Sequence, residues 1–329
     1  MKLLQFYLKG SNLCLKQFFS FLLFLTFFSL SFFPNHSKPS PKKQVRVSIS
    51  QVIDHPALNA TTKGIIDGLE KAGFCVGDNL ILDVEVAEGK PSIALQIAQK
   101  FVGNHADVLV GVGTTTSQAL AMASKNLDIP IVFATVTDPV GAKLVNPRKP
   151  ITGVSNLTDL EPQFNLFRKL VPKLKRLGIV YNPGEANSQS LLQQSIDVGK
   201  KMGIEIISSP ATKTSEVSTA ARQLIGHVEA IFINNDNTAL AAFQTVVKVG
   251  EDNKVPVFVS DTDLVPQGAV AALGPNQYDL GLQAAQLVVK ILEGADARKL
   301  PFEYAQKLEE KINPKAAHKI GIKLQQKDS

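Results

Sequence analysis

Hydrogen-bonding side chains are concentrated in six short segments of the chain, each of which directly follows a run of apolar residues. Threonine hydroxyls, asparagine amides and carboxylates in such places can orient a small polar molecule, and loops on a rigid scaffold commonly carry binding residues. The six segments are 51–59 (QVIDHPALN), 113–117 (GTTTS), 135–141 (TVTDPVG), 182–190 (NPGEANSQS), 234–238 (NNDNT) and 260–264 (SDTDL).

The segment GTTTS follows an apolar run and precedes a predicted helix over 118–125. It matches a nucleotide-binding loop only weakly, because Thr116 stands where a third glycine is required and no Gly-Lys-Ser/Thr follows. Thr114 or Thr115 can cap the helix with its hydroxyl. The same helix end can also bind a ligand carboxylate, because its free N–H groups and positive dipole end favour an anion.

Asp236 and Asp261 occupy equivalent positions in the last two segments. Each is a good candidate for a helix N-cap. Alternatively, one or both pair with a ligand ammonium group, because a closed site makes such a charge-assisted hydrogen bond strong. Asn235 and the asparagines around it would add neutral hydrogen bonds to the same ligand.

The other segments supply further candidates. His55 precedes Pro56 in a loop, where a histidine is either a turn residue or a ligand contact. No spacing of His, Cys, Asp and Glu matches a metal site, and no nucleophile signature such as GxSxG is present in the folded part. We therefore predict no catalytic residue, no metal and no cofactor, with a hydrolase or isomerase that uses Asp236, Asp261 or His55 as an alternative. The further binding candidates in these loops are Asp54, Asp138, Asn182, Glu185 and Asn187.

From Val45 onward, short β-branched runs alternate with amphipathic helical patterns. Such alternation predicts an α/β fold with parallel sheets and right-handed crossovers. Helices are expected over 62–72 and 188–202, each followed by a glycine stop. The expected strands are 45–49, 80–86, 108–112, 131–134, 176–181, 205–208, 230–233, 256–259 and 269–273.

The folded part repeats its own order of strand, polar loop and helix. Residues 45–74 correspond to 176–204, and 107–142 correspond to 229–269. Two similar halves predict two lobes whose strand ends face one cleft, which hinge closure would bury around a ligand. The predicted boundaries are 45–152 for lobe 1, 153–266 for lobe 2 and 267–329 for a crossover segment shared between the lobes.

The N-terminal region has the features of an export signal. Three lysines precede the apolar run 18–33, which is a little shorter than the ~20 residues that span a bilayer. We expect residues 1–33 to be a signal peptide or a membrane anchor and 34–44 to be a linker. The protein is then exported, and it is either periplasmic or anchored to the outer face of the cytoplasmic membrane.

The formal net charge of +6 arises from the leader and the linker together. The first 44 residues contain six lysines and no acidic residue, and removing those six from the 35 Lys and Arg leaves 29, against 29 Asp and Glu. The folded part is therefore formally neutral. A neutral domain gives no support for a nucleic-acid partner, because nucleic-acid binders concentrate basic charge on one face.

From Val45 to about Lys323 the chain resembles the tryptophan/tyrosine-type (TrpX-like) family of ABC-transporter substrate-binding proteins. The resemblance rests on IDHPALN, IPIVFATVTDPVGAKLV, ITGVSN, GIVYNPGEANS, FINNDNTAL and VPVFVSDTDLVPQGAVA, which occur in this order. It implies the type I periplasmic-binding-protein fold, with two Rossmann-like lobes joined by hinge crossovers, and a permease and an ATPase on other chains as partners. The leader departs from the family because no lipoprotein cysteine follows its apolar run.

The resemblance also implies the ligand and its contacts. It carries over the loop positions already named, and members of the family are associated with aromatic amino acids. The chain has no tryptophan, so Tyr278, Phe133 and the His55 imidazole would have to supply the apolar or stacking walls. We expect a monomeric solute-binding component of an ABC importer that captures an amino acid by hinge closure. An alternative function is that of a membrane-anchored sensory ectodomain with the same fold.

Overall fold

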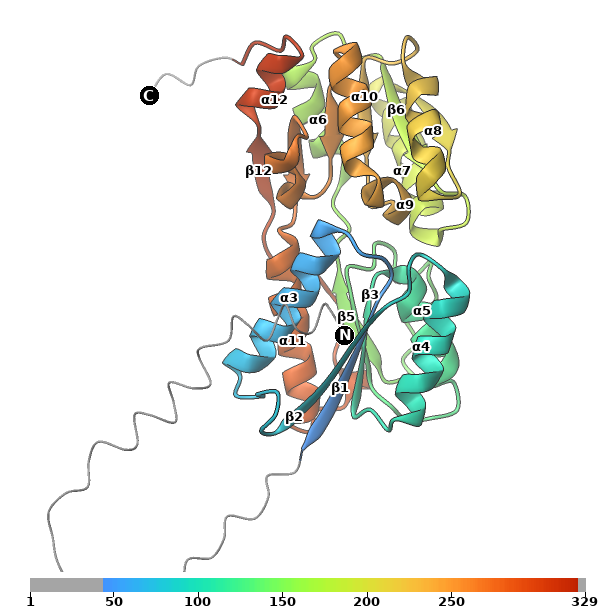
Figure 1. Ribbon diagram of the computed structural model, residues 1–329, viewed down its shortest axis with the longest axis vertical. Helices are drawn as coiled ribbons and strands as arrows, with labels where there is room; N and C mark the ends of the chain where they lie inside the picture. Colours follow the sequence, from blue (N-terminus) through green and yellow to red (C-terminus); the bar gives the residue numbers. More distant parts are fainter. Residues whose placement is uncertain (1–43, 325–329) are drawn as a thin grey trace, which may run out of the picture.

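Two six-stranded sheets, one above the other, form the framework of the protein (Figure 1). The computed structural model describes residues 44–324, so the predicted leader and nearly all of the predicted linker lie outside the described residues. We call the part built on the first sheet lobe 1 and the part built on the second sheet lobe 2.

The sheet of lobe 1 has the strand order β11-β5-β4-β3-β1-β2, and all of its pairings are parallel. Its strands are β1 (Val45–Gln51), β2 (Leu80–Val86), β3 (Val108–Val112), β4 (Ile131–Ala134), β5 (Ile151–Ser155) and β11 (Glu303–Tyr304). Helices cover both faces, which is why β3 and β4 are buried along their whole length. The helical elements are α3 (Pro56–Lys71), α4 (Pro91–Gly103), α5 (Thr114–Ala123), α11 (Gln277–Leu292) and η3 (Ala297–Lys299).

The sheet of lobe 2 repeats this order as β12-β10-β9-β8-β6-β7, with only the β10–β12 pair antiparallel. Its strands are β6 (Arg176–Tyr181), β7 (Glu205–Pro210), β8 (Ala230–Ile233), β9 (Val257–Val259), β10 (Ala271–Gly274) and β12 (Glu309–Ile312). Its helical elements are α6 (Leu160–Leu170), α7 (Ala186–Met202), η1 (Thr214–Glu216), α8 (Val217–Leu224), α9 (Asn237–Ala241), α10 (Phe243–Asn253), η2 (Thr262–Gln267) and α12 (Pro314–Lys319).

The predicted α/β fold is confirmed, with two sheets that are parallel except for the β10–β12 pair, and nine of the strands match to within two residues at each end. Three strands were missed. β5 contains a glycine, β11 has only two residues, and β12 carries three charged residues at the edge of its sheet. Such strands lack the apolar alternation that identifies a strand from sequence, and they form because a neighbouring strand already offers its hydrogen-bonding edge.

All three predicted helices begin earlier than their patterns predict, and α7 does so by two residues. α3 begins at Pro56, because His55 adopts an extended backbone and caps it, and α5 begins at Thr114. The cap of α5 is Gly113, at φ +96° and without a side-chain hydrogen bond, so neither Thr114 nor Thr115 is the cap. A Cβ at this glycine would lie 2.7 Å from the side chain of Val52. The early start brings the N-terminus of α5 to the end of β3.

The chain passes between the lobes three times. It crosses after β5, after β10 and after β11, so α11 belongs with lobe 1 although β10 pairs in lobe 2 (Figure 1). Three parallel connections permit the lobes to rotate about a hinge while each lobe stays intact.

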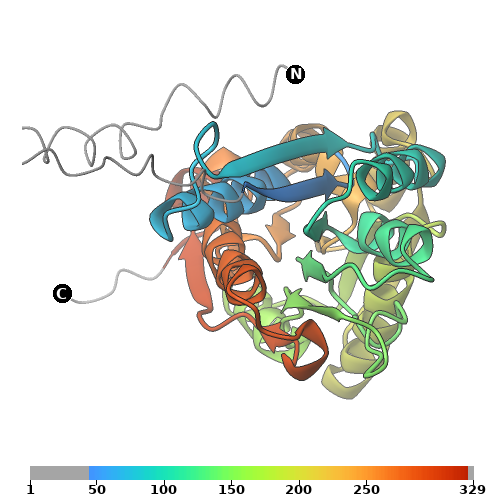
Figure 2. The same ribbon diagram turned by 90° about the horizontal axis from the view of Figure 1, so that it is seen from below.

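Helices α3 and α11 pack side by side against one face of the lobe 1 sheet (Figures 1 and 2). A Cβ on Gly64 would lie 2.2 Å from the carbonyl oxygen of Tyr278, and one on Gly281 would lie 2.1 Å from that of Thr61. Only glycine permits this close approach of two helix backbones. The Thr61 hydroxyl also hydrogen-bonds the Gln277 amide oxygen, which fixes the first turn of α11 beside α3.

Each sheet has an apolar core on both faces. In lobe 2 the largest buried side chains are phenylalanines, and Phe167 stacks on Phe258 with ring centroids 4.3 Å apart. Within residues 44–324, none of the helices is both long enough and apolar enough to cross a membrane. The two cores make each lobe a rigid body that can hold loops at its strand ends.

Candidate functional site

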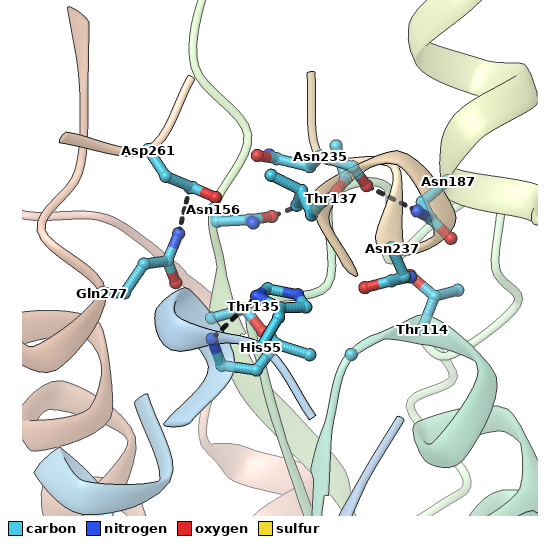
Figure 3. Close-up of a pocket in the computed structure, with 13 residues that line it drawn as sticks. His55, Thr114, Thr135, Thr137, Asn156, Asn187, Asn235, Asn237, Asp261 and Gln277 are labelled. Carbon is cyan, nitrogen blue, oxygen red and sulfur yellow. Dashed lines mark hydrogen bonds between the residues drawn. The ribbon is translucent and has the colours of Figure 1, made fainter. Parts of the chain in front are cut away.

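A buried pocket lies between the lobes, where the carboxyl ends of both sets of strands meet (Figure 3). The free space at its centre has a volume of about 10 Å³, which is room for about one water molecule. The lobes are therefore closed on each other. The pocket is lined by His55, Leu58, Gly113, Thr114, Thr135, Thr137, Asn156, Asn187, Asn235, Asn237, Leu240, Asp261 and Gln277.

His55 projects into this pocket from the start of α3 and is only 3% exposed. Its Nδ1 accepts the backbone N–H of Leu58, 3.5 Å away, as the helix cap. Burial lowers the pKa of His55 to about 4, against the opposing effect of the Asp54 charge. The neutral ring must then carry its proton on Nε2, and this buried N–H has no partner in the protein.

The N-terminus of α5 forms another part of the lobe 1 wall. Gly113 and Thr114 line the pocket, and this ten-residue helix directs its first free N–H groups toward the carboxyl edge of the sheet. Helix N-termini of this kind favour a carboxylate or other anion. Thr115 is half-buried and does not line the pocket.

Asp261 follows β9 and presents a carboxylate from lobe 2 that is 2% exposed. Its hydrogen-bond partner is the Nε2 amide of Gln277, the first residue of α11. Burial raises the pKa of Asp261 to about 7, and the nearby Asp263 charge adds to the effect. The described part of the chain places no cation beside this carboxylate, so a positively charged ligand group would be the natural partner.

Asp236, the equivalent residue after β8, faces away from the pocket. It caps α9 through the N–H of Ala239 at 2.6 Å and also accepts the N–H of Asn182 and the hydroxyl of Ser188. Burial, followed by the charge of Glu185, raises its pKa. Asp236 is therefore a helix cap, and of these two aspartates only Asp261 lines the pocket.

Glu185 anchors the loop that carries two pocket asparagines. Its carboxylate accepts the N–H and Nδ2 of Asn237, at 3.1 and 2.6 Å, and the N–H and hydroxyl of Thr238. Asn187 donates from Nδ2 to the carbonyl of Asn235 at 2.7 Å, which leaves its own Oδ1 buried without a partner (Figure 3). Glu185 and Asn182 therefore do not line the pocket, and instead stabilise the segments that carry the pocket residues.

The remaining predicted residues lie outside the pocket. Asp54 is exposed and accepts a hydrogen bond from Asn59. Tyr278 donates to Asp67 at 2.8 Å, and burial with that hydrogen bond raises its pKa to about 12. Of the other expected walls, Phe133 packs against Phe302 in the lobe 1 core, so neither it nor Tyr278 lines the pocket.

Apolar walls come instead from two leucines, Leu58 on lobe 1 and Leu240 on lobe 2. Leu58 lies three residues after His55, and Leu240 lies three residues after Asn237. This spacing of one helical turn from a polar pocket residue is the sequence signal that could have identified them. Three further polar residues were missed as candidates, although all lie in the segments that directly follow β4 and β5: Thr135, Thr137 and Asn156.

Gln277 was also missed, because it is the first residue of a long amphipathic helix and follows no predicted pocket loop. It reaches the site only because the chain crosses back to lobe 1 after β10. No local pattern marks such a residue, and its position depends on the packing of α11 on α3.

Asp138 joins the two lobes at the edge of the cleft. Its Oδ1 accepts the N–H of Gly141 in its own loop, and its Oδ2 accepts the hydroxyl of Ser190 on α7, 3.0 Å away. In the portion of the chain that the structure describes, this is the only side-chain hydrogen bond between the lobes away from the crossovers. Asp138 thus contacts the opposite lobe and not the pocket.

The described residues 44–324 contain no cluster of three or more His, Cys, Asp or Glu that could hold a metal ion. The pocket is instead lined by hydroxyls, amides, one imidazole and one carboxylate. These groups can bind and orient a small molecule that carries both charged and apolar parts.

Comparison with known proteins agrees with this geometry. A family model described as ABC transporter substrate binding protein matches residues 46–328. The chain is 33% identical over 282 residues to a tyrosine-binding protein of Clostridioides difficile (strain R20291), covering 84% of this chain and 81% of the relative.

Two solved structures are similar over 86% of this chain and 97% of their own. One is a conserved domain protein from Vibrio cholerae O1 biovar eltor, with 40% identity and a TM-score of 0.83. The other is an ABC domain in complex with L-Trp from Streptococcus pneumonia, with 30% identity and a TM-score of 0.81.

Proposed function

Because the chain belongs to the ABC transporter substrate-binding protein family, we propose that its interlobe pocket captures an amino acid with an apolar or aromatic side chain. The protein is a solute-binding component of an ABC importer. Proteins of this kind are binding proteins and not an enzyme class, and they work outside the cytoplasm.

The observation that carries the proposal is the opposite hydrogen-bonding character of the two pocket walls. Lobe 1 offers donors, namely the His55 Nε2–H and the free N–H groups at the start of α5. Lobe 2 offers acceptors, namely the Asp261 carboxylate and the buried Oδ1 atoms of Asn187 and Asn235. A zwitterion satisfies both walls, with its carboxylate toward lobe 1 and its ammonium toward lobe 2.

The apolar walls fit the side chain of such a ligand. Leu58 and Leu240 come from opposite lobes, so closure would press both against the ligand side chain. Support for an aromatic side chain comes from the relatives, of which one is a tyrosine-binding protein and one is a complex with L-Trp. The closed lobes leave about 10 Å³ free, which is far less than an amino acid occupies. The lobes must therefore open for the ligand to enter, and they must lie further apart in the complex than in this structure.

In this function the protein hands its ligand to a permease and an ATPase on other chains, without chemical turnover. It acts as a monomer in the periplasm or tethered to the outer face of the membrane by residues 1–33, which lie outside the described part.

The direct test is isothermal titration of the purified protein with L-tryptophan, L-tyrosine and the other amino acids. We expect submicromolar to micromolar binding of an aromatic or large apolar amino acid, a fall in the radius of gyration on binding, and recovery of the ligand unchanged by mass spectrometry. Binding of sugars or nucleosides and of none of the twenty amino acids would contradict the proposal, and a chemically altered ligand would contradict the absence of turnover.

A further inference from the structure

Thr135 combines two unusual properties that no capping or folding role accounts for. It directly follows β4, where its backbone has φ +56°, in the left-handed region. A β-branched residue rarely adopts this conformation, because its Cβ substituents collide with the backbone. Backbone strain of this kind persists only where the surrounding structure imposes it, and it is concentrated at binding and catalytic sites.

The other left-handed residues of the described chain have ordinary explanations. Apart from glycines they are Glu88, His105, Lys143 and Lys254, and all four are exposed, unbranched at Cβ and located in turns or at helix ends. Thr135 is the buried one, with 5% of its surface exposed. Turn chemistry therefore explains those four and not Thr135.

The second property is its hydroxyl. Oγ1 of Thr135 is buried and has no hydrogen-bond partner in the protein. Its neighbour two residues on behaves differently, since the Thr137 hydroxyl donates to the Asn156 Oδ1 at 3.1 Å (Figure 3). A buried hydroxyl without a partner is unfavourable in the free protein and becomes favourable once a ligand supplies the partner.

The position of this hydroxyl indicates which ligand group it meets. Thr135 lines the pocket from lobe 1, the same wall that presents His55 and the N-terminus of α5. Both of those are donors, and a threonine hydroxyl can donate as well. The acceptors Asn187 and Asp261 belong to the opposite lobe.

We propose that Thr135 is a specificity-determining residue whose strained backbone directs its hydroxyl to donate a hydrogen bond to the carboxylate of the bound amino acid. This inference rests on the proposed function and extends it to a residue of segment 135–141 that was not itself a candidate from the sequence. The role also explains the backbone strain, because Thr135 with an ordinary negative φ would direct its side chain away from this position.

The test is Thr135→Val, which keeps the branched shape and the backbone strain and removes only the hydroxyl. We expect the affinity for L-tryptophan or L-tyrosine to fall about 10- to 100-fold, because a hydrogen bond to a charged group is lost. Without ligand, the variant should melt at the same temperature as the wild type or higher, because an unpartnered buried hydroxyl is replaced by a methyl group.

Thr152→Val is the matched control. Thr152 is also buried and lies in lobe 1, but its hydroxyl donates to the carbonyl of Pro301 at 3.1 Å, outside the pocket. This control should melt lower than the wild type and bind the amino acid with unchanged affinity.

Two outcomes would overturn the inference: unchanged affinity in Thr135→Val, or a clear fall in its ligand-free melting temperature, which would reveal a protein partner for the hydroxyl. The failure of the proposed function looks different, because the wild type would then bind no amino acid at all. In that case the ligand-free melting temperatures still decide whether the Thr135 hydroxyl has a partner.

Discussion

At the level of single residues, the pocket contains several polar side chains with a hydrogen-bonding atom that the protein itself leaves unused. His55 is held neutral with its proton on Nε2, and Asn187 is oriented by its own donors so that Oδ1 faces inward. Asp261 is buried with one amide partner. Keeping such groups buried and unpaired destabilises the free protein, and the ligand recovers that free energy when it binds.

The stability of Asp261→Asn should depend on pH differently from that of the wild type. The native pKa of about 7 lies above the unfolded value of 3.8, so between these pH values the native state holds a proton that the unfolded state has lost. The contribution of Asp261 to stability is therefore present at low pH and is lost as pH rises toward 7. Thermal melts of the ligand-free protein at pH 4 to 7 should show the melting temperature of Asp261→Asn rising relative to that of the wild type as pH increases, with little further change above pH 7.

Ligand binding should show the opposite dependence on pH. An ammonium group pairs with the ionised form of Asp261, so the affinity of the wild type for the ligand should fall by up to about 10-fold per pH unit below pH 7. Asp261→Asn cannot ionise, so above pH 7 it should bind the ligand about 10- to 100-fold more weakly than the wild type, and its affinity should depend little on pH. Asp236→Ala serves as the comparison, because it should lower the melting temperature through loss of the α9 cap. Equal affinity of Asp261→Asn and wild type across this range would refute the pairing.

At the element scale, helix ends position most of the site. His55 and Gln277 lie at the starts of α3 and α11, and Thr114 and Asn237 begin α5 and α9. The close contact of α3 with α11 fixes two of these ends relative to each other, and Glu185 fixes the start of α9. Side chains on packed elements are placed more accurately than side chains on free loops, which suits a site that must recognise a ligand by several hydrogen bonds.

The element-scale prediction is that Gly64→Ala separates α3 from α11. The new Cβ would lie 2.2 Å from a backbone carbonyl oxygen, which cannot move without shifting the helix. We expect a loss of about 1–3 kcal/mol in the free energy of unfolding, measured by urea denaturation, together with weaker ligand binding.

Gly103→Ala is the matched control for this change. Gly103 is the last residue of α4, and no atom lies within 4 Å of the point that a Cβ would occupy there. The substitution should therefore be neutral or stabilise the protein by up to about 1 kcal/mol. Equal stability of the Gly64 and Gly103 variants would show that the helix contact tolerates a methyl group.

At the scale of the whole molecule, the two lobes must open for the ligand to enter and close to complete the pocket. The crossovers keep them connected, and the hydrogen bond from Ser190 to Asp138 joins them on the far side of the cleft. The bond exists only when the lobes are closed, so it lowers the free energy of the closed state relative to the open state.

The whole-molecule prediction is that Ser190→Ala shortens the lifetime of the complex. The loss of one partly exposed hydrogen bond should raise the ligand dissociation rate about 2- to 5-fold and leave the association rate unchanged, because the encounter takes place in the open form. Stopped-flow fluorescence with ligand displacement measures both rates. Gln193→Ala, on the exposed face of the same helix, should leave both unchanged, and an unaltered dissociation rate in Ser190→Ala would exclude a role in closure.

The sequence alone determined the duplicated α/β fold, the buried strands and the loops from which the site is built. These features follow from local periodicity, because a strand buried on both faces must be apolar and a polar segment after it must lie at the edge of the sheet. His55, Thr114, Asn187, Asn235 and Asp261 were accordingly among the candidates, and all five line the pocket. Their roles as ligand contacts, and the lobe boundaries at 152 and 266, stay predictions.

Which of the loop residues face the pocket depends on tertiary contacts and could not be predicted from the sequence. Asp236 and Asp261 follow equivalent strands, yet Asp236 turns toward Ser188 in its own lobe and Asp261 turns toward Gln277 across a crossover. The positive φ of Thr135 is likewise invisible in the sequence. The physical reason is that local spacing fixes the face of an element on which a residue lies, whereas the direction of a loop side chain depends on contacts with residues distant in the chain.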